Sequence, residues 1–113
     1  MNEQKFMSFI CELIKLYKTL VFTAKEFVIS KRIIKVTVSL GTCFSGKNKE
    51  EMYASCIEIE FWLKVLLLLI DEHELYEKTY ELCKKTEEII KIMEEILWKE
   101  KMKNYSYLTT RSI

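Results

Sequence analysis

The stretch KEEMYASCIEIEFWLKVLLLLI, residues 49–70, decides the fold. Its apolar residues recur at helical spacing, and one set of them forms a heptad-like seam. The members of this seam are Met52, Cys56, Ile59, Leu63, Leu66 and Ile70. A second apolar face of the same stretch carries Tyr53, Ile57, Phe61, Val65, Leu68 and Leu69. We therefore expect a long helix at the hydrophobic centre of the protein.

The second apolar face of residues 49–70 has two interpretations. A helix in a bundle needs one buried face, and this one has nearly two. The stretch is either a core helix with a wide buried surface or a helix whose extra face packs against another subunit. We favour the second interpretation. It predicts a homo-oligomer with an interface at Phe61, Val65, Leu68 and Leu69.

Segments on both sides of this stretch are also amphipathic. Residues 2–22 carry an apolar stripe at spacings of three and four, formed by Phe6, Ile10, Leu13, Tyr17 and Leu20. Residues 74–101 carry a similar stripe, formed by Leu75, Thr79, Leu82, Thr86, Ile89, Met93 and Ile96. Both segments are predicted to be helices that contribute one face to a shared core.

The segment between residues 23 and 44 contains a conflict. Thr23 and Glu26 fit a capping box, which predicts that a helix starts there. Residues 34–40, however, alternate strictly between apolar and polar and include four β-branched residues, a pattern typical of a strand. We predict a helix throughout, because a single strand among helices has no partner for its backbone hydrogen bonds.

The connections between these segments are short. Residues 45–48, Ser-Gly-Lys-Asn, form the clearest turn, and Asn48 with Glu51 predicts the next helix start. Residues 71–74 form a short polar break. With only two glycines and no proline, the composition favours long helices. We predict an all-α, up-down-up-down antiparallel four-helix bundle over residues 1–103, followed by a flexible tail at 104–113.

Composition limits location and chemistry. The four cysteines (Cys11, Cys43, Cys56 and Cys83) form no C-x-x-C pair and lie on or beside apolar stripes, so we predict buried free thiols and no metal site. The most apolar run, residues 61–70, is half the length of a membrane span and contains Lys64. The first residues lack the layout of an export signal. These features predict a cytoplasmic protein that does not enter a membrane.

Motifs for catalysis are missing from the sequence. There is no nucleophile motif, no phosphate-binding glycine-rich loop and no HExxH zinc helix. His73, the single histidine, stands in a polar loop beside glutamates, where a solvated or helix-capping role is more typical than acid–base catalysis. We predict a protein that is not an enzyme and has no cofactor.

Charge is distributed unevenly along the chain. Residues 1–49 hold nine Lys/Arg against three Glu, whereas residues 50–113 hold nine Lys/Arg against fourteen Asp/Glu. One basic cluster comprises Lys25, Lys31, Arg32 and Lys35, and a second, near the C-terminus, comprises Lys99, Lys101, Lys103 and Arg111. These side chains are either ordinary solvated charge or a surface that binds the phosphates of RNA or DNA.

The runs FTAKEFVISKRI (residues 22–33) and GKNKEEMYASCIEIEFWLKVLLLLIDEHELYEKTYELCKKTEEIIKIMEEILWK (residues 46–99) resemble a family of four-helix bundle proteins. The family includes proteins encoded in intervening sequences of large-subunit ribosomal RNA and accessory variability proteins of diversity-generating retroelements. The resemblance rests on Phe22, Lys25, Arg32, Ile33, Phe61, Trp62, Leu63, Tyr80, Ile89, Met93 and Trp98. Thr23 stands where the accessory proteins typically have proline.

This resemblance implies a homopentameric barrel of bundles. Its retroelement branch implies a complex with a reverse transcriptase and template RNA, in support of mutagenic cDNA synthesis. We therefore expect a non-enzymatic accessory scaffold that binds nucleic acid and a reverse transcriptase. An oligomeric protein of the intervening-sequence type with another partner, and a small helical regulator, are the alternatives.

Overall fold

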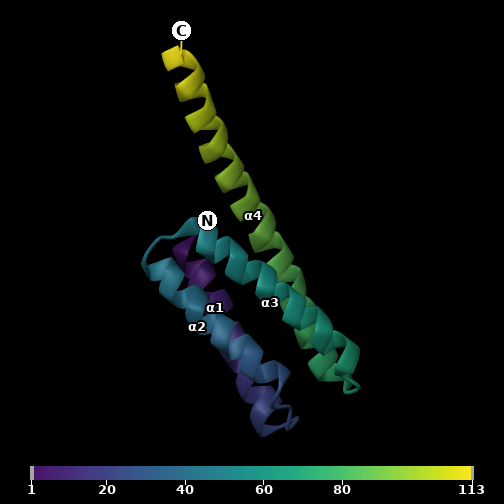
Figure 1. Ribbon diagram of the computed structural model, residues 1–113. Helices are drawn as coiled ribbons and strands as arrows, with labels where there is room; N and C mark the ends of the chain where they lie inside the picture. The colour runs from purple at the N-terminus through teal and green to yellow at the C-terminus, as the bar shows by residue number, and fades with distance from the viewer. Residues whose placement is uncertain (1, 113) are drawn as a thin grey trace.

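The computed structural model describes the backbone of residues 2–112 and the side chains of residues 2–105. It contains the helices α1 (Glu3–Phe22), α2 (Ile29–Ser45), α3 (Lys49–Leu69) and α4 (His73–Ser112). Consecutive helices pack against each other and alternate in direction (Figure 1). The predicted all-α, up-down-up-down four-helix bundle is confirmed, and residues 34–40 are helical.

Polar side chains set the starts of the helices. The Asn2 side chain accepts hydrogen bonds from the backbone of Gln4 (2.8 Å) and Lys5 (3.3 Å) at the start of α1. Asn48 Oδ1 accepts from the Glu51 backbone N–H (3.1 Å) at the start of α3, as predicted. Each bond satisfies a backbone N–H that has no partner within the helix.

The predicted start of the second helix at Thr23 was wrong. Thr23 is the C-cap of α1, and α2 begins six residues later at Ile29. The Glu26 carboxylate accepts hydrogen bonds from the backbone N–H groups of Val28 (3.0 Å), Ile29 (3.0 Å) and Ser30 (2.7 Å). A carboxylate satisfies several N–H donors at once and interacts favourably with the positive end of the helix dipole, so Glu26 defines the start.

The core lies along the axis of the bundle. Its most deeply buried apolar side chains are those of Phe6, Leu13, Leu20, Ile33, Leu40, Ile59, Leu63 and Leu66. Three threonines share this interior, and each hydroxyl donates to the carbonyl four residues earlier: Thr37 to Ile33, Thr79 to Leu75 and Thr86 to Leu82, at 2.7–2.8 Å. These bonds remove the penalty of burying a hydroxyl.

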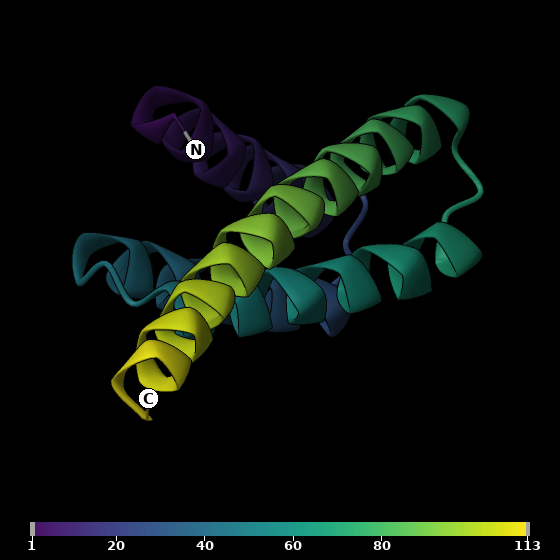
Figure 2. The same cartoon turned by 90° about the horizontal axis from the view of Figure 1, so that it is seen from above.

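The four helices of the bundle do not pack equally closely against their neighbours. α1 and α2, α2 and α3, and α3 and α4 pack extensively, whereas α1 and α4 make the thinnest contact. Figure 2 shows α4 running obliquely across the other helices. A groove lies between α1 and α4.

α4 is longer than the bundle. A helix of 40 residues extends about 60 Å at a rise of ~1.5 Å per residue, so α4 accounts for the 62 Å length of a molecule only 23 Å across. Its C-terminal turns project beyond the other three helices (Figure 1). The predicted domain boundary at residue 103 therefore does not coincide with a helix end. The predicted flexible tail, residues 104–113, lies for the most part outside the described side chains.

Candidate nucleic-acid interface and assembly face

The outer face of α3 is apolar and largely exposed. Phe61 is 55% exposed, Leu68 85% and Leu69 60%, while Val65 is half-buried against the core. Ile57 is also exposed on this helix. We call these five side chains the assembly face. Of the second apolar face predicted from the sequence, Tyr53 and Val65 therefore pack against the core of their own chain, whereas Ile57, Phe61, Leu68 and Leu69 are exposed.

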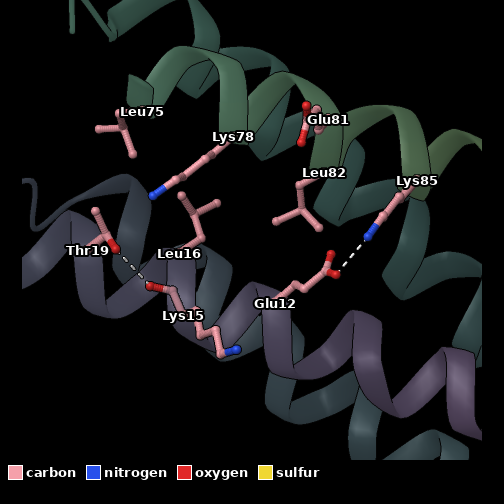
Figure 3. A pocket seen from close by; sticks show the side chains of 9 residues that line it. All are labelled: Glu12, Lys15, Leu16, Thr19, Leu75, Lys78, Glu81, Leu82 and Lys85. Atoms are coloured by element: carbon pink, nitrogen blue, oxygen red, sulfur yellow. Dashed lines mark hydrogen bonds and ion pairs between the residues drawn. The ribbon is translucent and has the colours of Figure 1, made fainter. Parts of the chain in front are cut away.

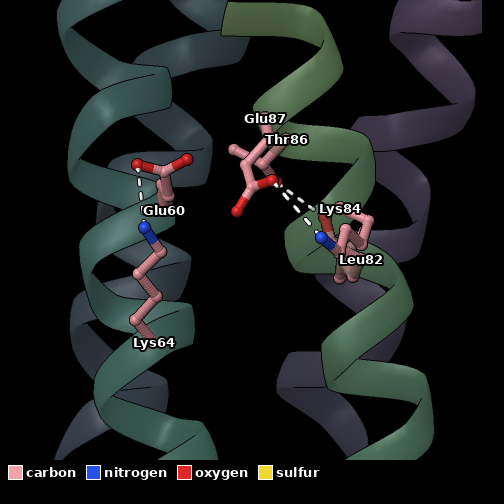
Figure 4. Close-up of polar contacts among 6 residues, drawn as sticks. All are labelled: Glu60, Lys64, Leu82, Lys84, Thr86 and Glu87. Carbon is pink, nitrogen blue, oxygen red and sulfur yellow. Dashed lines mark hydrogen bonds and ion pairs between the residues drawn. The ribbon is translucent and has the colours of Figure 1, made fainter.

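The margins of the assembly face carry few charges. Glu58 and Lys64, one of each sign, are exposed on the same helix. Lys64 Nζ lies 3.6 Å from Glu60 Oε1, one turn earlier on α3 (Figure 4). On the neighbouring α4, Lys84 Nζ lies 3.9 Å from Glu87 Oε2, also within one helix. Lys64 and Lys84 are thus each paired within their own helix, whereas Glu58 has no ion-pair partner among the described side chains.

The predicted basic residues of α2 lie together. Lys31, Arg32 and Lys35 are all exposed on the first two turns of the helix. Lys25 is exposed in the preceding loop, where its backbone adopts φ 57°. Among the described side chains, no carboxylate lies within ion-pair distance of these four cations. Their charge is available to an external anion.

The second predicted cluster, Lys99, Lys101 and Lys103, is exposed on the C-terminal part of α4. Glu100, in the same turn, forms an ion pair with Lys49 at the start of α3. This contact places the cluster at the end of the bundle where α2 finishes. The two basic clusters therefore lie at opposite ends of the bundle. Arg111 lies outside the described side chains.

A groove between α2 and α3 was not predicted from the sequence. Its polar lining comes from Arg32, Lys35, Ser39, Ser55, Glu58 and Trp62. The Arg32 guanidinium lies 5.7 Å from the centre of the Trp62 ring, a cation–π contact across the two helices. Because this contact depends on how α2 and α3 are rotated against each other, no pattern within either helix reveals it.

The groove between α1 and α4 has an apolar floor and a charged rim. Leu16, Leu75 and Leu82 form the floor. Lys85 Nζ and Glu12 Oε1 bridge the two helices at 2.7 Å (Figure 3). The rim contains both signs of charge, so it offers no concentrated field for a charged ligand.

The thiols are free, but only three of the four are buried. Burial raises the pKa of the Cys56 thiol to about 12. The pKa of Cys43 is raised by burial and by the hydrogen bond from its Sγ to Glu51 Oε2 (3.3 Å), and burial raises that of Cys83. Since the thiolate is the reactive form, a raised pKa lowers the reactivity of each of these three thiols. Cys11 is exposed, which corrects the prediction that it is buried.

The described residues also bear on three other features: a catalytic histidine, a metal site and a membrane-spanning helix. His73 is exposed, with Nε2 3.8 Å from Glu77 Oε1. No three His, Cys, Asp or Glu side chains among the described residues are arranged to hold a metal ion. No described helix is long and apolar enough to span a membrane.

Comparisons with protein-family models, with curated proteins and with solved structures found no match. Two surfaces of the bundle are thus the candidates for function: the assembly face on α3, and a basic edge on α2 formed by Lys31, Arg32 and Lys35.

Proposed function

We propose that this chain is a non-enzymatic scaffold that assembles with copies of itself through α3 and binds nucleic acid through the start of α2. The observation that carries the proposal is the exposed assembly face, in which Leu68 is 85% and Phe61 55% exposed to solvent. A contiguous apolar face of this kind on a small domain marks an interaction site.

A second copy of the chain is the partner that fits this face. The exposed charges of α3 near this face include both signs, Glu58 and Lys64, so no charge of a single sign opposes the approach of a second copy. The face covers Ile57 to Leu69, about 18 Å of helix at a rise of ~1.5 Å per residue. The family resemblance of the sequence favours five copies in a ring.

Nucleic acid fits the basic edge. Lys31, Arg32 and Lys35 are exposed and lack carboxylate partners among the described side chains. Each phosphate that such a cation neutralises releases counterions and strengthens binding at low salt. A ring of subunits repeats the cluster, so weak contacts act together. The cluster at Lys99, Lys101 and Lys103 adds a second contact at the far end of each subunit.

The particular biological role that we propose is that of an accessory protein of a diversity-generating retroelement. This proposal is supported by the resemblance of the sequence to the accessory proteins, which implies a reverse transcriptase and its template RNA as partners. A reverse transcriptase gene and near-identical template and variable repeats beside the coding sequence are the expected genomic context. A locus without them would favour the intervening-sequence type or a helical regulator.

A salt series tests nucleic-acid binding. Fluorescence anisotropy with labelled structured RNA should show log affinity falling linearly with log salt concentration. Replacing Lys31, Arg32 and Lys35 together with Gln should reduce the slope by about one unit for each phosphate contact that is lost. The fold should remain, because these side chains are exposed.

A matched control changes the same net charge elsewhere. Replacing Lys18, Lys78 and Lys91 with Gln removes three cations that are also exposed, on α1 and α4. This variant should bind RNA with nearly the slope of the unmodified protein. Equal slopes for both triple variants, or no affinity for RNA or DNA at low salt, would refute binding at the basic edge.

A further inference from the structure

The groove between α2 and α3 has a feature that phosphate binding does not use. Trp62 is half-buried and turned toward α2, where its ring meets the Arg32 guanidinium at 5.7 Å. Phe61, the next residue, packs edge-on against the same ring, with centroids 4.9 Å apart and an interplanar angle of 80°. The indole is therefore held in place by contacts on two sides.

The rest of the groove is polar. Lys35 lies three residues after Arg32 and shares its side of α2, and both line the groove. Glu58 lies four residues before Trp62 and shares its side of α3. The groove thus brings together an aromatic ring, two cations and one carboxylate from two helices.

We infer that this groove binds one unpaired base of a single-stranded nucleic acid. The base stacks on the surface formed by Trp62 and Arg32, and Lys35 binds the adjoining phosphate. The inference rests on the proposed nucleic-acid binding and specifies the kind of strand. Bases in a duplex have both faces covered by stacking, whereas an unpaired base offers a face to an aromatic ring or a guanidinium plane.

Glu58 gives the groove a preference among bases. A carboxylate accepts hydrogen bonds and donates none, so it pairs with an exocyclic amino group such as that of cytosine N4. Uracil presents the O4 carbonyl oxygen where cytosine presents this amino group, and a carboxylate repels that oxygen. Oligocytidine should therefore bind more tightly than oligouridine of the same length.

Tryptophan emission reports occupancy of the groove. The chain has two tryptophans, so Trp98→Phe leaves Trp62 as the single reporter. Trp98 is 61% exposed on α4, and this change should leave the fold and the RNA affinity unchanged. Oligocytidine should then quench the remaining emission in proportion to the bound fraction measured by anisotropy with labelled RNA.

Two further variants test the named roles. Trp62→Ala should weaken oligocytidine binding about tenfold or more, since stacking contributes strongly for each base, while Trp62→Phe should restore part of the loss. Glu58→Ala changes an exposed residue and should narrow the preference for cytosine over uracil without changing the salt slope. Circular dichroism and urea midpoints verify that each variant is folded.

The outcomes separate this inference from the proposed function. Salt-dependent RNA binding without quenching, and with equal affinity for Trp62→Ala, would overturn the stacking site and leave phosphate binding in place. An unchanged base preference in Glu58→Ala would overturn the role of the carboxylate. If no single-stranded nucleic acid binds at low salt, both the groove and the proposed nucleic-acid function are wrong.

Discussion

Leu68 and Leu63 lie on the same helix but should respond very differently to truncation. Leu63 is fully buried in the core, whereas Leu68 is 85% exposed on the assembly face. Leu63→Ala should lower the free energy of unfolding by about 2–5 kcal/mol, the range for deleting a buried leucine side chain. Leu68→Ala should change the unfolding free energy of the monomer by less than about 0.5 kcal/mol, as exposed substitutions do.

Leu68→Ala should mainly weaken the association of one chain with another. Burying a leucine side chain contributes about 1.5–3 kcal/mol, and Leu68 has most of its surface available for burial by a partner. A loss of about 2 kcal/mol weakens association roughly 30-fold, since ~1.4 kcal/mol corresponds to a factor of ten. Larger losses follow if Leu68 occurs on both sides of one interface.

Two measurements separate these effects. Sedimentation velocity over a range of protein concentrations gives the association constant. Urea unfolding at a protein concentration low enough for the oligomer to be dissociated gives the stability of the monomer. Val38→Ala is the matched control, because Val38 is 63% exposed on α2, away from the assembly face. A core-sized loss of monomer stability in Leu68→Ala, or an unchanged association constant, would refute the assignment of this face.

Three further predictions concern local structure. Glu26→Ala removes the carboxylate that caps α2 and should lower the free energy of unfolding by about 1 kcal/mol in urea titrations, whereas Thr23→Ala should change it little. Under native conditions Cys11 alone should react quickly with a thiol reagent such as DTNB; fast reaction of Cys56, whose pKa is raised to about 12, would contradict its burial. Backbone N–H groups at the start of α4 lower the pKa of Glu72 from its ordinary value of 4.5. The ionised Glu72 carboxylate therefore stabilises the folded protein fully at pH values above 4.5, and this stabilisation is lost as the pH falls through the lowered pKa. Glu72→Gln should therefore be less stable than the unmodified protein at pH 7, with the difference vanishing in acid; a constant difference would count against the cap.

The prediction that residues 34–40 are helical is confirmed. The helical spacing of the apolar residues, which lets them pack into the core, outweighs the preference of β-branched residues for strands. In a strand, Val36 and Val38 would share one face. In α2, Val36 is 6% exposed and Val38 is 63% exposed, as the helical period requires. Thr37 is accommodated because its hydroxyl bonds to the Ile33 carbonyl. The turn at residues 45–48 and the cap at Asn48 were also predictable, since both depend on neighbouring residues alone.

The errors have physical reasons. Thr23 and Glu26 match a capping box by residue type and spacing, in which the Glu26 carboxylate would accept from the backbone N–H of Thr23. In the structure the carboxylate instead accepts from backbone N–H groups that follow it, and the sequence pattern does not distinguish the two arrangements. Cys11 borders an apolar stripe, and its exposure depends on the angle at which α1 meets its neighbours. The contact between Arg32 and Trp62 likewise depends on the rotation of α2 against α3. Local patterns determine the helices; their relative orientation determines the groove.

Sedimentation equilibrium of the unmodified protein at micromolar concentration tests most directly whether the chain assembles. We expect a discrete particle several times the 13.6 kDa mass of one chain, with five copies as the expected number. Dilution should dissociate this particle reversibly. A single species of 13.6 kDa at all concentrations would contradict the assembly face and, with it, the proposed scaffold.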